Sequence, residues 1–150
     1  EGPAMSLVGP FPTSKVIERL SGVSELRLVD GAAGLVAAVE SPPRAVPAAY
    51  VLVEEQGREP GDYTGRYAQP MTATVKVVLW VRHAAAGAGG KAAAAMEEVE
   101  RAVRSALRNW TPGHPFEPLW VANSGGDQPY GGQLTRQVIF RTHYRDQEQS

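Results

Sequence analysis

The sequence predicts an α+β fold. We expect a mixed, mainly antiparallel sheet of about four to five strands, one long helix packed on a face of that sheet and one or two shorter helices. Residues 72–82 alternate along the chain as a half-buried strand does, and residues 91–110 repeat apolar side chains as an amphipathic helix does. Two strand-like segments then follow with no helix between them, and this order favours an α+β fold.

The N-terminal part predicts a short helix followed by a strand. Thr13 or Ser14 can cap the helix with a side-chain hydroxyl, and Ser21-Gly22 ends it. Residues 26–29 then predict a short strand.

A second, Ala-rich helix is predicted from 32 to about 39. Asp30 can cap its N-terminus, and Pro42-Pro43 stop it because proline lacks a backbone N–H group and clashes with the preceding turn. Residues 49–53 are β-branched and aromatic, so they predict a compact strand.

Residues 54–70 predict a long, mobile loop. The segment is polar and contains three glycines and two prolines. Loops of this length inside compact domains are uncommon and tend to be functional. We therefore expect this loop to be a contact surface.

Residues 72–82 form the clearest predicted strand. Its even-numbered face is mixed and includes Trp80. Its odd-numbered face is wholly apolar and is expected in the core: Ala73, Val75, Val77, Leu79 and Val81.

The clearest helix is predicted from Lys91 to Trp110, with an apolar stripe expected to lie across the sheet. Its polar face contains two pairs of opposite charge at i,i+4 spacing, each worth about 0.2–0.5 kcal/mol. These pairs are Glu97 with Arg101 and Glu100 with Arg104.

The C-terminal part predicts two strands, 116–122 and 134–144, with a turn-rich stretch from 123 to 133 between them and a polar tail from 146 to 150. The second strand has a half-buried pattern typical of an antiparallel sheet. Leu134, Val138, Phe140 and Tyr144 point one way, whereas Gln137, Arg141 and Arg145 point the other way.

Length and composition suit a single domain from 5 to 145 that needs no metal or cofactor for stability. Residues 1–4 precede a Met and resemble an addition left by expression, so they are excluded from fold arguments. Cys is absent, and 15 basic against 16 acidic residues give a net charge of -1. We expect a soluble protein with no membrane partner and no specific nucleic-acid partner.

The stretch Gly87 to Lys91, with Ala92, formally matches the dinucleotide-binding fingerprint G-x-G-x-x-A before a helix. Three alanines lengthen the connection from the strand, however, and an acidic residue on a following parallel strand is missing. A Walker A motif fails because Ala85 stands at the first Gly position and Ala92 replaces the Ser or Thr. A flexible connector before a helix is the favoured interpretation.

No pattern in the sequence predicts catalysis or metal binding. His83, His114 and His143 have none of the spacings that metal sites use, and Ser124 lies in no nucleophile elbow. We therefore expect no catalytic, cofactor-binding or metal-binding residues, and no enzyme.

A basic strip on the sheet is a further possibility. It would combine Lys76, Arg82, Arg136, Arg141 and Arg145 with the aromatic residues Trp80 and Tyr130. Nucleic-acid readers built on sheets use such surfaces. No ribonucleoprotein-type motif is present, so a solvated or subunit-facing surface is favoured.

The order and spacing of these segments resemble the Mu-like phage tail terminator proteins over nearly all of the chain from Leu7 to Arg145. The likeness departs at Asn109, where a Gly before the helix-terminal Trp is more typical. The segments that carry it are Lys15–Leu20, Leu28–Ala33, Pro47–Val51, Tyr67–Gln69, Ala106–Pro112 and Val138–Arg145.

This resemblance implies a non-enzymatic subunit of a bacteriophage or prophage tail. Such subunits assemble into a ring, commonly a hexamer, that caps the tail tube, stops its polymerisation and offers a surface for head joining. The implied partners are other copies of the chain, the tail-tube protein and a head-completion or connector protein. The implied locations are the virion tail and, during assembly, the bacterial host cytoplasm.

Subunit contacts are expected in the loop 54–70, in the turn 123–133 and on the polar face of the last strand. The candidate contact residues are Arg58, Tyr63, Arg66, Tyr67, Gln69, Tyr130, Gln137 and Arg141. Two alternatives stay open: another head–tail connector or minor virion protein, and a small nucleotide-binding enzyme that uses the Gly87–Lys91 loop.

Overall fold

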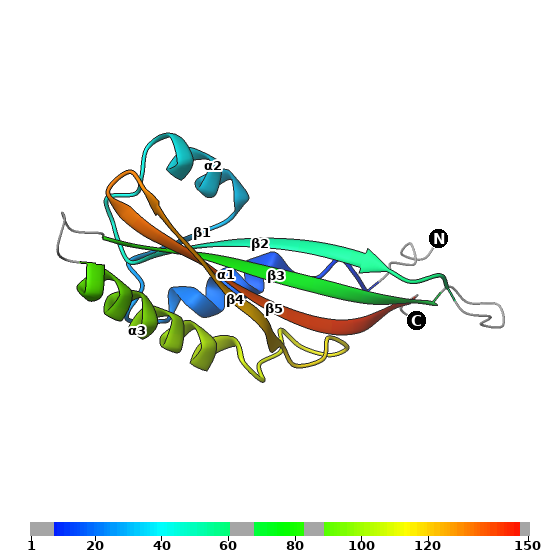
Figure 1. Cartoon of the computed structure of the whole chain (residues 1–150). Coiled ribbons are helices and arrows are strands. Elements are labelled where there is room, and N and C mark those ends of the chain that lie inside the picture. Colours follow the sequence, from blue (N-terminus) through cyan, green and yellow to red (C-terminus); the bar gives the residue numbers. More distant parts are fainter. Residues whose placement is uncertain (1–7, 61–67, 83–88, 148–150) are drawn as a thin grey trace.

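The structure, a computed structural model, describes residues 8–60, 68–82 and 89–147. This part of the chain has the predicted α+β architecture (Figure 1). In chain order its elements are α1 (Thr13–Ser21), β1 (Leu28–Asp30), α2 (Ala32–Glu40), β2 (Ala48–Gly57), β3 (Ala68–Arg82), α3 (Gly89–Leu107), β4 (Trp120–Tyr130) and β5 (Gln133–Gln147).

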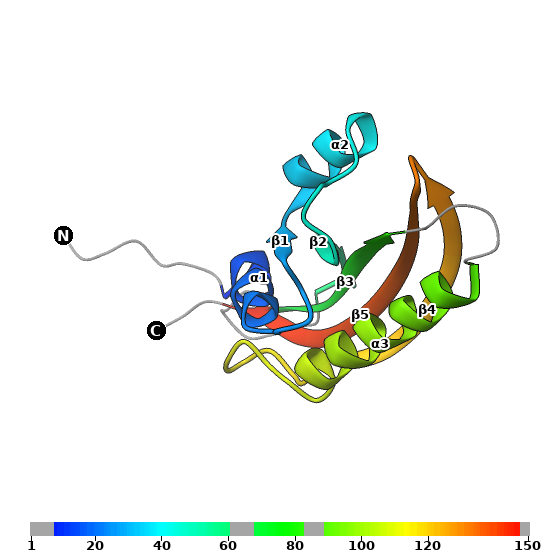
Figure 2. The same cartoon turned by 90° about the vertical axis from the view of Figure 1, so that its left-hand side faces the viewer.

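The strands of the described part form one sheet in the order β1-β2-β3-β5-β4. β1 runs parallel to β2, whereas the other neighbouring strands are antiparallel. The sheet is therefore mixed and mainly antiparallel, as predicted. Figure 2 shows how strongly β5 and β4 curve across it.

α1 and α3 cover one face of the sheet, below it in Figure 1, which we call the helix face. The predicted odd-numbered face of β3 is completely buried there, from Ala73 to Val81. α3 adds Met96, Val103 and Leu107, which are also fully buried. Each such side chain stabilises the fold by about 1.5–3 kcal/mol. The main core therefore lies where the sequence placed it.

α2 lies on the opposite face, which we call the outer face, above the sheet in Figure 1. There Ala38 packs with Tyr50 and Trp80 in a second, smaller core. Trp80 is only 2% exposed, so it is a core residue and not an exposed aromatic of a basic strip. The mixed even-numbered face of β3 is thus explained by a helix that covers only one end of it.

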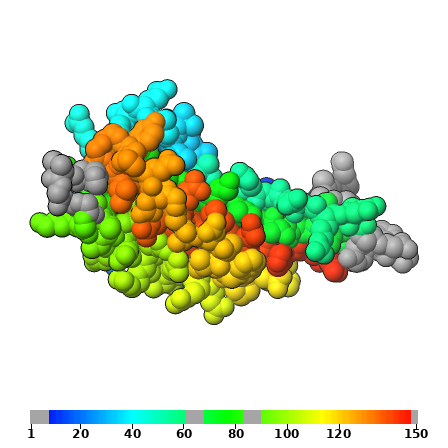
Figure 3. Space-filling model, viewed as in Figure 1, coloured from blue at the N-terminus to red at the C-terminus, as the bar shows by residue number. Residues whose placement is uncertain are grey.

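The prediction of a long loop from 54 to 70 is wrong at both ends of that range. β2 continues to Gly57 and β3 begins at Ala68, and the Arg58 N–H donates to the Pro70 carbonyl at 3.0 Å. Residues 61–67 lie outside the described residues. The paired ends of β2, β3 and β5 extend past the helices (Figures 1 and 3), and we call this extension the tongue. No helix covers these strand ends, so polar residues are tolerated there. Their polar sequence is the reason that a loop was predicted.

The C-terminal hairpin also differs from the expectation. β4 occupies Trp120–Tyr130, so most of the predicted turn is a strand, and the chain turns at Gly131-Gly132 instead. Register shifts between Val121 and Asn123 and between Gly125 and Gln128 absorb the turn-like residues as bulges. β5 continues to Gln147, two residues into the predicted tail.

The ends of the helices differ by a few residues. α3 ends at Leu107 and not at Trp110, because Asn109 adopts a left-handed φ of 63°. Asn tolerates this conformation better than most residues, as does the Gly that is typical at this position of the family that the sequence resembles.

Neither short helix has the predicted side-chain cap. Pro12 and Gly31 are the N-cap residues of α1 and α2, in place of Thr13 or Ser14 and of Asp30. The Asp30 carboxylate instead accepts a hydrogen bond from the Gly31 N–H at 2.8 Å.

Candidate assembly surfaces

The structure separates the predicted contact residues into distinct places. Tyr63, Arg66 and Tyr67 lie outside the described residues. Arg58 and Gln69 lie where the tongue leaves the described part of the chain. Tyr130, Gln137 and Arg141 lie in the β4–β5 hairpin, but they are spread along its length.

Gln69 fastens the tongue. Its Nε2 donates to the Arg58 carbonyl at 2.9 Å, beside the backbone bond from the Arg58 N–H to Pro70. The Arg58 backbone is thereby held in place while its side chain is exposed. Gln69 therefore has a structural role in positioning Arg58.

The root of the tongue is held by a partly buried hydrogen bond between β5 and β2. The Tyr144 hydroxyl donates to Glu55 Oε1 at 2.5 Å, and the Phe11 N–H donates to the same oxygen at 3.1 Å. Burial raises the pKa of Tyr144, and the charge of Glu55 raises this pKa further. The tongue is therefore anchored to the segment before α1.

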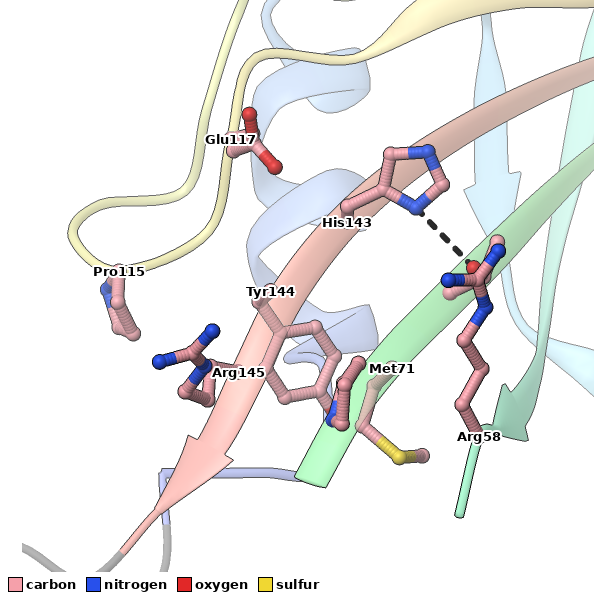
Figure 4. A pocket seen from close by; sticks show the side chains of 9 residues that line it. Arg58, Met71, Pro115, Glu117, His143, Tyr144 and Arg145 are labelled. Carbon is pink, nitrogen blue, oxygen red and sulfur yellow. Dashed lines mark hydrogen bonds between the residues drawn. The ribbon is translucent and has the colours of Figure 1, made fainter. Parts of the chain in front are cut away.

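A groove of about 500 Å³ runs across the tongue (Figure 4). His143 on β5 forms a hydrogen bond through Nδ1 with Thr72 Oγ1 on β3, at 3.1 Å. The groove contains two arginines and one carboxylate, that of Glu117. The residues that line it are Arg58, Pro70, Met71, Thr72, Pro115, Glu117, His143, Tyr144 and Arg145.

Trp120 adjoins this groove and was not among the predicted contact residues. It lies opposite Arg141 in the β4–β5 register, and its indole is 6.3 Å from the His143 imidazole. Trp120 is 43% exposed, an unusual state for so large a side chain. The sequence placed it in the predicted strand 116–122 without assigning it to a face. Its exposure follows from its position on an edge strand, which only the strand order reveals.

Tyr130 lies at the other end of the hairpin, beside α2. Its phenol meets the Trp80 indole edge to face at 5.6 Å. The hairpin tip is fastened there, because Gln133 Nε2 donates to the Pro43 carbonyl at 2.6 Å and Gly131 lies against Pro42. Tyr130 and Arg141 therefore belong to separate surfaces.

Near this tip, α2 exposes apolar side chains of its own. Val36 is 66% exposed, and Val39 is exposed as well. Gln137, the last of the predicted contact residues, lies on β5 opposite Gly125 and lines a small hollow of about 160 Å³ at the bulges of β4. The described surface thus offers several different places for contacts.

A network of charges around the buried Glu100 joins α3 to the C-terminal hairpin. Glu100 is 6% exposed and accepts hydrogen bonds from Arg136 at 2.8 Å and from Ser124 at 2.9 Å. Arg104 pairs with Glu100 at 2.5 Å, as the i,i+4 spacing predicts, and Arg136 also forms a two-pronged pair with Asp127 at 2.6 Å. Among the described residues no ion pair joins Glu97 to Arg101.

The network sets the charge state of its members. Burial alone would raise the pKa of the Glu100 carboxyl, but hydrogen bonds from Arg136 and Ser124 and the charge of Arg104 outweigh burial and lower this pKa. The pKa of Arg136 is raised by its hydrogen bonds to Asp127, against the opposing effect of burial. Glu100 and Arg136 are therefore both ionised at neutral pH.

This network corrects the expected basic strip. Arg136 pairs with Leu79 in the register, so it lies on the helix face, whereas Arg141 and Arg145 lie on the outer face. Lys76 is also on the outer face, but it pairs with Glu54 at 3.1 Å. The strip is therefore divided between two faces and partly neutralised.

Within the described residues no three His, Cys, Asp or Glu side chains are grouped so that they could hold a metal ion. The Gly87–Lys91 stretch is described only from Gly89, where it forms the first turn of α3, and His83 lies outside the described residues. No helix in the described part is both long and apolar enough to cross a membrane.

Comparison with known proteins shows which family and which solved structure the chain is similar to. The family model described as phage tail terminator protein matches residues 6–149. A solved structure titled virion of native gene transfer agent particle contains a similar chain, with 16% identity and a TM-score of 0.50, covering 89% of this chain and 93% of that chain. At this identity the likeness concerns the fold alone. No curated protein matches the chain significantly.

Proposed function

Because the chain belongs to the phage tail terminator protein family, and is thus a structural protein of phage-like tails, we propose that it caps the tail tube. In this role it stops tube polymerisation and forms the surface to which the head joins, without catalysis. The observation that carries the proposal is the family match over residues 6–149, nearly the whole chain.

The cap is a ring of identical subunits, with six copies as the working stoichiometry. A cyclic ring needs two different, complementary surfaces on each subunit. The described surface supports such an arrangement, because exposed apolar side chains occur both on α2, at Val36 and Val39, and on edge strand β4, at Trp120. α2 covers the β1–β2 side of the sheet, whereas β4 forms the opposite edge.

The ring has two further partners, the tail-tube protein on one side and a head-completion or connector protein on the other. It assembles in the host cytoplasm and stays in the virion tail. The tongue supports this role, since a fastened hairpin with an exposed Arg58 can reach a neighbour without loss of the subunit's core.

Deletion of the gene from the phage or phage-like element that encodes the chain tests the proposal. Electron microscopy of the particles is expected to reveal tails longer than normal and without heads, restored by expression of the chain in trans. Tails of normal length that do not join heads would favour the alternative role as a head–tail connector. Normal tails joined to heads would exclude both roles.

A further inference from the structure

Three arginines gather on the outer face of the tongue. Arg141 and Arg145 alternate with His143 along that face of β5, in register with Thr74, Pro70 and Thr72 of β3. Arg58, at the end of β2, and Arg145 line the groove shown in Figure 4, which Arg141 adjoins. We call Arg58, Thr72, Trp120, Arg141, His143 and Arg145 the basic tongue surface.

The positive charge of this surface is local. The groove contains one carboxylate, that of Glu117, and the nearby Lys76 is neutralised by Glu54. The whole chain, in contrast, has a net charge of -1. Such a local excess attracts a negatively charged partner and sets its orientation.

The surface is held in place before any partner binds. The Glu117 N–H donates to the His143 carbonyl at 3.1 Å, and Thr142 Oγ1 donates to the Glu117 carbonyl at 2.5 Å. These bonds hold the segment around Glu117, which forms one wall of the groove, against β5. The hydrogen bond with Thr72 holds the imidazole of His143. A partner therefore loses less conformational entropy to ordering than it would on a loose loop.

Trp120 gives the surface an apolar anchor. Its side chain is 43% exposed beside Arg141, and in the described part of the chain α2 covers the outer face only at its other end. Trp and Arg are among the residues that are most enriched at the energetic centres of protein interfaces. The surface thus combines charge with an aromatic contact.

We propose that the basic tongue surface binds an acidic segment of a protein partner in the tail, with carboxylates on Arg58 and Arg141 and an apolar side chain on Trp120. Planar guanidinium groups bind carboxylates through paired hydrogen bonds. A protein fits better than a nucleic acid, because single-strand binders stack bases on several aromatics within a broad basic surface, and here one exposed Trp and one carboxylate are present.

This inference rests on the proposed assembly role, but its test uses the isolated chain. A fluorescein-labelled decamer of glutamate serves as the probe, and fluorescence anisotropy measures its dissociation constant at low salt. The variant Arg58→Gln/Arg141→Gln is expected to bind about tenfold more weakly, since it loses two charge-assisted contacts. The matched variant Arg101→Gln/Arg108→Gln loses the same charge from exposed positions, one on α3 and one directly after it, and is expected to bind within about twofold of wild type.

Trp120→Ala provides a second arm. It changes no charge. It is expected to weaken the binding of an acidic decamer that contains one Leu and to have little effect on the binding of the all-glutamate probe. Circular dichroism checks that each variant is folded. Equal losses in both arginine pairs would overturn the proposal, because binding would then be non-specific. Tighter binding of a DNA oligonucleotide of equal charge, lost in Arg58→Gln/Arg141→Gln, would overturn it in favour of a nucleic acid.

The two proposals fail separately. A chain that binds no acidic probe but still limits tail length is a terminator whose tongue has another use. A chain that binds the probe but leaves tail length unchanged has the basic tongue surface without the capping role.

Discussion

Glu100 accepts hydrogen bonds from Arg136 on β5 and Ser124 on β4, and it pairs with Arg104 on its own helix. Removal of one member of a buried ion pair leaves the others without a counter-charge, and this costs more than the pair contributes. Arg136 keeps Asp127 as a second partner, so the cost here is moderate. Glu100 therefore joins three elements through one side chain.

We predict that Glu100→Gln lowers the free energy of unfolding by about 2–4 kcal/mol at neutral pH. The lowered pKa of Glu100 means that its contribution is complete above the ordinary Glu pKa, about 4.3, and is lost as pH falls through the lower folded value. The free energy of unfolding of wild type, measured with urea, should therefore fall on acidification below about pH 4.3. It should fall less steeply in Glu100→Gln.

Glu97→Gln is the control for this prediction. Glu97 is exposed on the same helix and has no ion-pair partner among the described residues, so its replacement is expected to change stability by less than about 0.5 kcal/mol. An acid response of Glu100→Gln identical to that of wild type would contradict the account of the network.

At the scale of elements, α2 is attached to the sheet by a small apolar contact. Of its residues only Ala38 is buried, and it packs in the second core with Trp80 and Tyr50, beside the partly buried Leu35. Its neighbour Ala37 is exposed. Only one side of the helix thus contacts the outer face of the sheet, although apolar residues occur on all of its sides.

We predict that Ala38→Asp detaches α2 from the sheet, because an unpaired carboxylate cannot be buried without a large cost. The free energy of unfolding should fall by about 2 kcal/mol or more, and tryptophan emission should shift to the red as water reaches Trp80. Ala37→Asp, which changes an exposed position, should leave both unchanged. Equal effects of the two substitutions would show that Ala38 is not the contact.

The elements that could be predicted are those whose burial has one regular period. β3 and α3 place their apolar residues at intervals of two and of three or four, so the sequence located their buried faces correctly. The outer ends of β2 and β3 were taken for a loop, since they are rich in polar residues, glycine and proline and lack a continuous apolar face. Most of β4 was taken for a turn because its second bulge, between Gly125 and Gln128, contains two glycines with positive φ, and glycines also mark turns.

The candidate site was predictable only in part, for a related reason. Arg141 and Arg58 were named from their polar surroundings, and the structure brings both to the tongue. Their association with Trp120 depends on the register between β4 and β5, which no local pattern encodes. The face of Arg136, in contrast, follows from the period of two along β5, which groups Arg136 with Leu134 and Val138 on the helix face.

At the scale of the whole molecule, the residues that stabilise the fold are separate from the surface proposed for contacts. The helix face holds the main core and the Glu100 network, while the outer face is covered by α2 at one end and open at the tongue. A subunit built in this way can change its contacts at the tongue without disturbing its core. This separation suits a structural protein of a tail, which must fold first and assemble afterwards.

The most direct measurement of the central claim is the length of tail tubes grown in vitro from the matching tail-tube protein, counted by electron microscopy with and without this chain. The purified chain, added during growth, is expected to stop elongation and to appear as extra density at one end of each tube. Longer incubation should then leave the length distribution unchanged. Tubes that continue to grow at the same rate, with both ends bare, would contradict the proposed capping function.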